Sequence, residues 1–240
     1  MPRGPLEVEE GVPVSLVKVL PDASASGGAQ MALDDGLLQT VDQVLARRYT
    51  WAPPALSLGK FQDVELKPGL PFDVVRRPSG GRAVLHGGGF EWSFAVVFPP
   101  RAFGAGRRAG ADVALPYELV TGAFAGALRG LGVTLDGARG TPYQRSALCF
   151  ASVLRHDLMS RGEKLVAVAQ ARREGRVLVH GSVLERRPPD ELVAAVETLL
   201  GEPWEADGLE ATGVVVDADR LWGGVLLRLE AGLRMLKEAS

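Results

Sequence analysis

The apolar residues near the start of the chain change spacing, which predicts a strand followed by a helix. The apolar run Val14–Leu20 predicts a strand, and the Gly-, Ala- and Ser-rich segment Ala23–Gly28 predicts a break in regular structure. Apolar residues then recur at helical spacing and predict one amphipathic helix. They are Met31, Leu37, Leu38, Val41, Val44 and Leu45.

The middle of the chain alternates short apolar runs with segments rich in Gly and Pro. The runs Leu56–Leu58, Val74–Val75 and Trp92–Phe98 predict strands, because Gly and Pro on either side would end a helix. Leu119–Leu131 predicts a second helix, although Gly disfavours helix interiors. Its glycines are spaced by four, which indicates close packing against another element: Gly122, Gly126 and Gly130.

The second half of the chain predicts a hairpin and two more helices. Lys164–Ala171 and Arg176–Leu184 are apolar or alternating segments around Glu174-Gly175, a typical hairpin turn. Glu191–Leu200 follows as a helix. A final helix over about 219–238 carries one apolar stripe, made of Leu221, Val225, Leu229, Leu233 and Leu236. Strands and helices that do not strictly alternate predict an α+β fold.

Composition narrows the class of protein. The 240 residues are 46% hydrophobic and 23% charged, so we expect one globular domain over 1–240. The net charge of -2 argues against a dedicated nucleic-acid binder. The chain does not begin with basic residues followed by an apolar run, which is the pattern that would indicate secretion or membrane insertion. We therefore expect a cytoplasmic protein without a membrane partner. One Cys and three scattered His residues exclude an internal disulfide framework and predict no metal site.

The single cysteine, Cys149, is the candidate nucleophile. A cysteine can hold a carboxylic acid as a thioester, which stays reactive toward an amine without ATP in the same step. Taken alone, a cysteine is more often a small buried hydrophobic residue. Reactivity needs the thiolate, and therefore a nearby cation, for which Lys164 is the candidate. The Ser79-Gly80-Gly81 segment predicts either an ordinary turn or a loop whose N–H groups approach a ligand.

Four segments of the chain form a pattern in a fixed order: Met31-Ala32-Leu33-Asp34, the stretch from Trp51 to Gln62, the stretch from Arg76 to His86, and Lys164 to Ser182. Together they resemble the lipoate-protein ligase and octanoyltransferase family. The resemblance spans roughly residues 30 to 200 in family order, and it implies the biotin/lipoyl ligase catalytic domain, a mixed and mainly antiparallel sheet flanked by helices. It also implies a medium-chain acyl substrate and a lysine acceptor on a lipoyl domain.

The branches of this family differ in their use of cysteine. Cys149-Phe150 stands fifteen residues before Lys164 (164 − 149 = 15), the spacing of the cysteine-dependent octanoyltransferases. A resemblance to this branch implies octanoyl-acyl carrier protein as the donor and no cofactor. It implies lipoyl domains of 2-oxoacid dehydrogenases or the glycine-cleavage H protein as the acceptors. Three alternatives stay open: a lipoate-protein ligase that needs ATP and magnesium, an octanoyl amidotransferase with the H protein as donor, and a non-catalytic lipoyl-domain-binding paralogue.

The resemblance also implies roles for individual residues. Cys149 is expected to carry the acyl group, and Lys164 to ionise the thiol and to bind the acyl carbonyl oxygen. His86 is expected to pack over the acyl pocket. The remaining residues expected to bind the acyl group and to line its pocket are Arg77, Ser79, Gly80, Gly81, Arg82, Ala167, His180, Gly181 and Ser182.

Two departures from the family pattern fall close to this expected pocket. Gly87 stands where the family usually has an acidic residue, directly after the motif histidine. Ala167 and Val168 replace the usual Gly-Ser after the motif lysine. Their larger side chains are expected to shorten the acyl tunnel or to block an adenylate. A second interpretation is that the chain is a divergent paralogue with another substrate.

Overall fold

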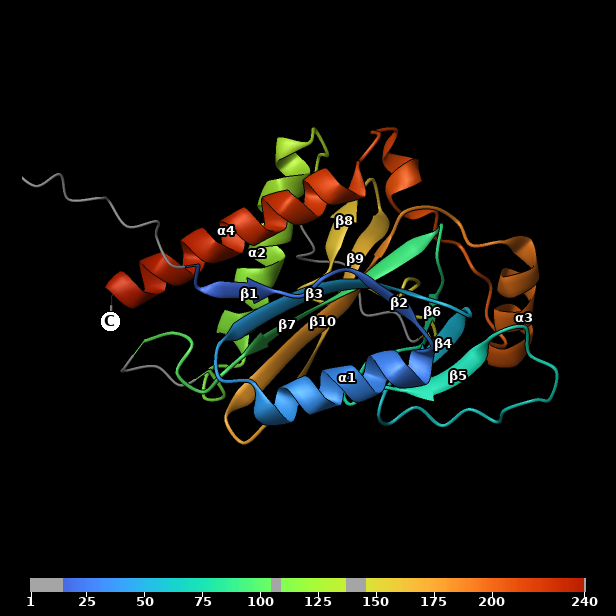
Figure 1. Cartoon of the computed structure of the whole chain (residues 1–240). Helices are drawn as coiled ribbons and strands as arrows, with labels where there is room; N and C mark the ends of the chain where they lie inside the picture. Colours follow the sequence, from blue (N-terminus) through green and yellow to red (C-terminus); the bar gives the residue numbers. More distant parts are fainter. Residues whose placement is uncertain (1–14, 105–108, 137–145, 240) are drawn as a thin grey trace, which may run out of the picture.

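A seven-stranded, mainly antiparallel sheet forms the centre of the protein (Figure 1). The computed structural model describes residues 15–104, 109–136 and 146–239. The sheet order is β1-β3-β7-β10-β9-β8, and β2 also pairs with β3. Only β1 and β2 run parallel to their neighbour β3. The strands are β1 (Val17–Val19), β2 (Ala23–Ala25), β3 (Val44–Trp51), β7 (Glu91–Phe98), β8 (Leu158–Ser160), β9 (Glu163–Arg173) and β10 (Arg176–Leu184).

Helices cover both faces of this sheet (Figure 1). Helices α2 (Ala114–Gly130) and α4 (Ala218–Glu238) pack together on one face, where apolar side chains of both meet those of β7, β9 and β10. Helix α1 (Gly27–Thr40) covers the other face and buries Met31 and Leu38 there. The mixed, mainly antiparallel sheet flanked by helices is the predicted fold, which is therefore confirmed.

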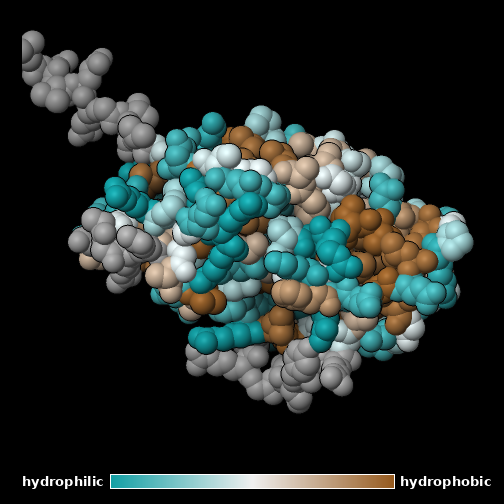
Figure 2. Space-filling model, turned by 90° about the horizontal axis from the view of Figure 1, so that it is seen from below, coloured by the Kyte–Doolittle hydropathy of each residue, from teal (hydrophilic) through white to brown (hydrophobic). Residues whose placement is uncertain are grey.

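A smaller sheet lies beside the large one. It has the order β5-β4-β6, with β4 (Ala55–Leu58) between β5 (Asp73–Arg76) and β6 (Val84–His86). Apolar residues of this sheet share a core with α3 (Asp190–Leu200). Figure 2 shows apolar side chains gathered on the surface at the end of the molecule where Figure 1 places α3 and β5.

The predicted hairpin is confirmed. Strands β9 and β10 pair from Arg173 and Arg176 inward, and the turn residues Glu174 and Gly175 both have positive φ, at 50° and 79°. This backbone is the one that two-residue hairpin turns need, which explains the value of Gly at the second position. The hairpin carries Lys164 at its start and His180 on its returning strand.

The first helix is shorter than the periodicity predicts. It ends at Thr40, and Val44 and Leu45 begin strand β3 instead of a further helical turn. Val44 pairs with Val17, and Leu45 pairs with Val97, so the backbone of both residues is paired in the sheet. Both side chains are buried. Val44 and Leu45 are adjacent apolar residues buried on opposite faces of the sheet, so they show no alternation that distinguishes a strand from a helix, which is why the spacing misled.

Two smaller corrections concern the first elements. The expected break at Ala23–Gly28 contains strand β2, and helix α1 begins at Gly27 after Ser26, whose Oγ accepts a hydrogen bond from the N–H of Ala29 at 3.4 Å. The strand predicted from Val14 is confirmed only over Val17–Val19, and Val14 itself lies outside the described residues.

The glycines of α2 have unequal roles. A Cβ at Gly126 would lie 2.6 Å from the Arg228 side chain of α4, whereas a Cβ at Gly122 would meet nothing within 4 Å. Gly126 therefore packs against a side chain of α4, as its spacing predicts, whereas Gly122 does not pack against another element. A short 3-10 helix, Gly208–Thr212, lies between α3 and α4.

Candidate active site

A pocket lies where the large and small sheets meet. Its wall takes residues from α1, from β3, β7, β9 and β10 of the large sheet, and from β4 and β6 of the small sheet. The apolar residues of the wall include Met31, Trp51, Val84, Leu154 and Val168. The polar and small residues of the wall include Ser57, Arg77, Gly81, Arg82, His86, Ser93, Cys149, Ala167, His180, Gly181 and Ser182.

Cys149 sits in a turn at the rim of this pocket. Its N–H donates to the Ala83 carbonyl at 2.8 Å, and its own carbonyl accepts from the N–H of Ser152 at 3.2 Å. The side chain is half-buried, and the thiol is free. The turn is therefore fixed to the end of the small sheet, and the sulfur is held at the pocket wall.

Lys164 lies behind Cys149, as the fifteen-residue spacing predicts. Its fully buried ammonium is 3.8 Å from Sγ of Cys149 and donates to the Cys149 carbonyl oxygen at 2.5 Å. It also forms an ion pair with the buried carboxylate of Asp157 at 2.7 Å. Asp157 thus offsets the cost of burying the charge and directs the ammonium toward Cys149.

Arg77 places a second buried cation near the thiol. The guanidinium donates to backbone carbonyls of Ser57, Gly80 and Arg82, and it makes no ion pair with any described residue. Burial lowers its pKa below the ordinary value, and the negative charge of a Cys149 thiolate acts in the opposite direction. Arginine stays protonated even so. A thiolate or an oxyanion in the pocket therefore faces a cation that has no carboxylate partner of its own.

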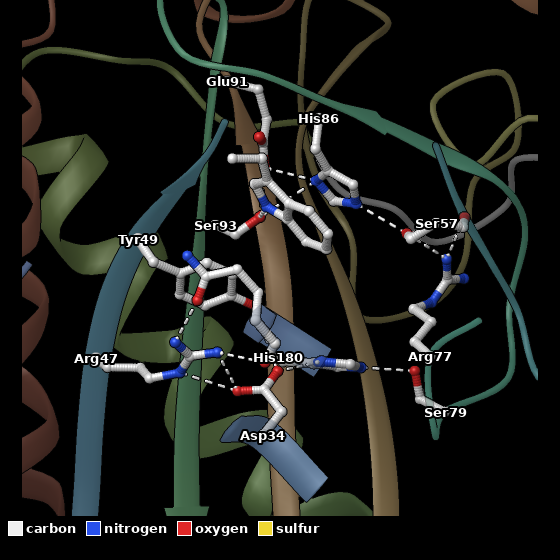
Figure 3. A network of polar contacts seen from close by, with 12 residues as sticks. Asp34, Arg47, Tyr49, Ser57, Arg77, Ser79, His86, Glu91, Ser93 and His180 are labelled. Carbon is white, nitrogen blue, oxygen red and sulfur yellow. Dashed lines mark hydrogen bonds and ion pairs between the residues drawn. The ribbon is translucent and has the colours of Figure 1, made fainter. Parts of the chain in front are cut away.

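A chain of hydrogen bonds runs from the pocket into the sheet through His86 (Figure 3). Oγ of Ser57 is 2.8 Å from Nε2 of His86, and Nδ1 of His86 is 3.0 Å from Oε1 of Glu91. Arg77 donates to the same Ser57 oxygen at 2.9 Å. Trp51 stacks on the imidazole, with ring centroids 4.0 Å apart and an interplanar angle of 12°. The ring is therefore held in one orientation.

A second chain of the same kind runs through His180 (Figure 3). Oγ of Ser79 is 2.6 Å from Nε2 of His180, and Nδ1 of His180 is 3.1 Å from Oδ2 of Asp34. The other oxygen of Asp34 accepts from Arg47 at 2.6 Å. Burial alone would raise the pKa of Asp34, but the hydrogen bond from His180 and the charge of Arg47 outweigh it and hold the pKa below its usual 3.8.

Most of the residues predicted for the site meet at the pocket. Lys164 lies directly behind Cys149, whereas Ser79 is turned toward His180 and Gly80 lies on a separate outer groove beside Lys60 and Phe61. Their proposed roles stay predictions. On the pocket wall are Cys149, Arg77, Gly81, Arg82, His86, Ala167, His180, Gly181 and Ser182.

Backbone geometry explains two of the glycines. Gly81 has φ of 97°, a value that favours glycine. A Cβ at Gly181 would lie 2.2 Å from the Ala167 carbonyl oxygen and 2.6 Å from the Phe94 ring. Strands β9 and β10 therefore come together at this point only because Gly181 has no side chain.

The structure also accounts for the departure at Gly87. A Cβ there would lie 2.5 Å from the ring of Phe90, so an acidic side chain has no room without movement of that ring. The carboxylate beside His86 comes instead from Glu91, on strand β7. Ala167 and Val168 both lie on the pocket wall, as the expectation about acyl length requires.

Several residues of the site were not predicted from the sequence. Ser57 and Glu91 lie on ordinary-looking strands, and only their burial in the folded protein gives them a role. Asp157 was not predicted either: it forms an ion pair with Lys164, whereas its neighbour His156 stacks on Tyr117 with ring centroids 4.4 Å apart. Lys164, which was predicted as the cation near Cys149, was the one available signal, because a lysine buried at such a site needs a carboxylate.

The described part of the chain holds no group of three or more His, Cys, Asp or Glu residues that could bind a metal ion. Among the same residues, no helix is both long and apolar enough to cross a membrane.

Comparison with known proteins identifies the family. Residues 26–218 match the family model described as Lipoyl protein ligase A/B catalytic domain. Octanoyltransferase LipM of Carboxydothermus hydrogenoformans is 33% identical over 183 residues, which cover 70% of this chain and 65% of that protein. Octanoyltransferase LipM of Staphylococcus aureus is 31% identical over 180 residues, which cover 68% and 63%. The chain spans about two thirds of the length of these relatives.

Solved structures show the same fold. A putative lipoate protein ligase from T. acidophilum with bound lipoic acid has a TM-score of 0.67 at 21% identity, covering 92% of this chain and 86% of that one. Lipoate-protein ligase A bound with ATP has a TM-score of 0.65 at 22% identity, covering 92% and 85%. Fold and sequence agree, and the chain belongs to the lipoyl protein ligase A/B catalytic domain family.

Proposed function

We propose that this protein is an octanoyltransferase that uses Cys149 as a covalent carrier. The thiolate of Cys149 attacks the octanoyl thioester of acyl carrier protein, so that a new thioester forms and the carrier thiolate leaves. A lysine of a lipoyl domain then takes the octanoyl group as an amide. The reaction exchanges one acyl bond for another, so it needs neither ATP nor a metal ion.

The observation that carries this proposal is the half-buried thiol of Cys149 at a pocket wall, with the buried Lys164 ammonium 3.8 Å from the sulfur and the buried Arg77 guanidinium on the same wall. A cation favours the thiolate, which is the reactive form. The Lys164 ammonium, 3.8 Å from the sulfur, and the Arg77 guanidinium both serve this purpose. The same groups stabilise the negative charge that develops on the acyl carbonyl oxygen during attack.

The relatives support the choice of reaction and of acceptor. Those reported above are named octanoyltransferases, and a solved structure of the same fold comes from a lipoylation system that includes an E2 lipoyl domain. We infer that the acceptor of this chain is also a lipoyl domain, of a 2-oxoacid dehydrogenase or of the glycine-cleavage H protein. The catalytic unit is a single domain.

Transfer in the absence of ATP tests this function. The protein is mixed with octanoyl-acyl carrier protein and a lipoyl domain, with ATP omitted and a chelator present, and octanoylated product is measured by mass. Wild type should form product, and Cys149→Ala should form none while keeping its circular dichroism spectrum and unfolding midpoint.

The other outcomes separate the alternatives. A requirement for ATP with free octanoate or lipoate as substrate would identify a ligase. Transfer only from octanoylated H protein would identify an amidotransferase. A complex with the lipoyl domain but no product under any condition would identify a binding protein.

A further inference from the structure

The second half of the proposed reaction needs a proton acceptor, and this inference rests on that proposed function. The acceptor lysine arrives as an ammonium ion, because its ordinary pKa is about 10.4. An ammonium has no lone pair, so it must lose one proton before it attacks the thioester. It loses a second proton when the amide forms. The pocket therefore needs a group that removes the first proton.

The cations at the pocket cannot take this proton. Lys164 is an ammonium held against the Asp157 carboxylate at 2.7 Å, and Arg77 and Arg82 are guanidinium groups without a free lone pair. Among the described residues of the wall, only His86 and His180 carry an imidazole. Nε2 of His180 is directed at Ser79, which does not line the pocket. Nε2 of His86 is directed at Ser57, which does.

Ser57 is placed to pass a proton from the pocket to His86. Its hydroxyl oxygen accepts from Arg77 at 2.9 Å and lies 2.8 Å from Nε2 of His86, as Figure 3 shows. A hydroxyl has one hydrogen and two lone pairs, so one lone pair remains for a group in the pocket. Glu91, 3.0 Å from Nδ1, stabilises the imidazolium that results.

We propose that Ser57, His86 and Glu91 form the proton relay that activates the acceptor lysine. The first ammonium proton passes to Ser57 Oγ as the Ser57 proton passes to His86 Nε2, which leaves a neutral amine. The amine attacks the thioester carbonyl carbon, the C–N bond forms and the C–S bond breaks. The second proton goes to the departing Cys149 thiolate, and His86 releases its proton to solvent. Ser57 is a catalytic residue in this scheme, and Glu91 is a positioning residue.

The charges around the relay favour this direction of transfer. The groups that face His86 are the Glu91 carboxylate on one side, the Arg77 guanidinium beyond Ser57 on the other, and the neutral Trp51 and Ser93. A buried guanidinium disfavours an incoming ammonium and thus favours the neutral amine. Glu91 offsets the charge that His86 gains.

The test separates the two halves of the reaction in Ser57→Ala. The octanoyl-Cys149 form is prepared with octanoyl-acyl carrier protein, a lipoyl domain is added at saturating concentration, and loss of the adduct is followed by intact-protein mass. We expect acylation within a few-fold of wild type and discharge about 100-fold slower, since general acid–base catalysis typically contributes about 10²–10⁴-fold. The adduct should accumulate.

The pH dependence distinguishes a relay from a structural role. The defect of Ser57→Ala should shrink as pH rises toward the pKa of the acceptor lysine, because the amine is then already neutral. His86→Gln should behave in the same way. Thr121→Ala, which also removes a buried hydroxyl but lies on α2 outside the pocket, is the matched control and should discharge at the wild-type rate.

The outcomes are distinct for the two proposals. Discharge at the wild-type rate in Ser57→Ala, or a defect that stays constant with pH, overturns the relay and leaves the function in place. If wild type forms no adduct, the proposed function itself fails.

Discussion

Two hydrogen-bond chains of the same composition lie on either side of this pocket, and they differ in what they are connected to. One chain runs from Ser57 through His86 to Glu91, and its serine lines the pocket. The other runs from Ser79 through His180 to Asp34, and its serine does not line the pocket. Asp34 is also bound by Arg47, a cation with 2% exposure. The same arrangement of a serine, a histidine and a carboxylate therefore serves proton transfer in one place and attachment of a loop in the other.

The two hydrogen-bond chains differ in what binds the carboxylate at the end of each. Asp34 binds a permanent charge, so its carboxylate cannot be exchanged without leaving Arg47 unpaired. Glu91 binds an imidazole that can be neutral or charged. A serine–histidine–carboxylate arrangement is thus not sufficient to assign a chemical role, and the contacts at its two ends decide it.

The largest expected effect concerns stability, where we expect the two hydrogen-bond chains to differ most. Asp34→Ala leaves the buried Arg47 without its carboxylate, which should lower the free energy of unfolding by about 3–5 kcal/mol. Glu91→Ala removes the partner of an imidazole that can stay neutral, so we expect only about 1–3 kcal/mol. Urea unfolding of both variants measures the difference. Equal losses would mean that the two chains are not distinct.

The next effect concerns the rate of the first half of the reaction, the acylation of Cys149. Lys164→Ala removes a cation 3.8 Å from the thiol, and it should slow acylation of Cys149 about 100- to 1000-fold. The rate of alkylation by iodoacetamide, measured against pH, should move toward higher pH because less thiolate is present. Alkylation curves that superimpose on those of wild type would show that Lys164 does not ionise the thiol.

The smallest effect is the acid response of the chain through His180. The folded pKa of Asp34 lies below its usual 3.8, so ionised Asp34 stabilises the fold above that value. This stability is lost as pH falls through the lower, folded pKa. The difference in unfolding free energy between wild type and Asp34→Asn should therefore be constant near neutral pH and diminish below about pH 4. A difference that grows as pH falls would contradict the assignment.

Much of the frame could be predicted from the sequence, because it depends on local signals. The hairpin rests on Glu174-Gly175, and the C-terminal helix rests on a stripe of five apolar residues. The proximity of Cys149 and Lys164 came from a resemblance in spacing and not from local chemistry. The start of strand β3 was missed because its first two residues, Val44 and Leu45, are both apolar and buried, and they also fit the helical spacing of the residues before them.

The relay could not be predicted, because nothing local distinguishes its members. Ser57 and Glu91 are polar residues in mostly apolar strands. Ser57 reaches His86 because β4 pairs with β6 in the small sheet, and Glu91 reaches it from β7 of the large sheet. The motif comparison even suggested that the carboxylate was missing, since Gly87 replaces an acidic residue. Glu91 supplies that charge from another strand, which only the packed structure reveals.

The most direct test of the account is the mass of the intact protein after mixing with octanoyl-acyl carrier protein alone. Without ATP, wild type should gain one octanoyl group on Cys149, which hydroxylamine removes and which a lipoyl domain added afterwards takes up. A protein that stays unmodified under these conditions, yet octanoylates a lipoyl domain when free octanoate and ATP are supplied, would contradict covalent transfer through Cys149.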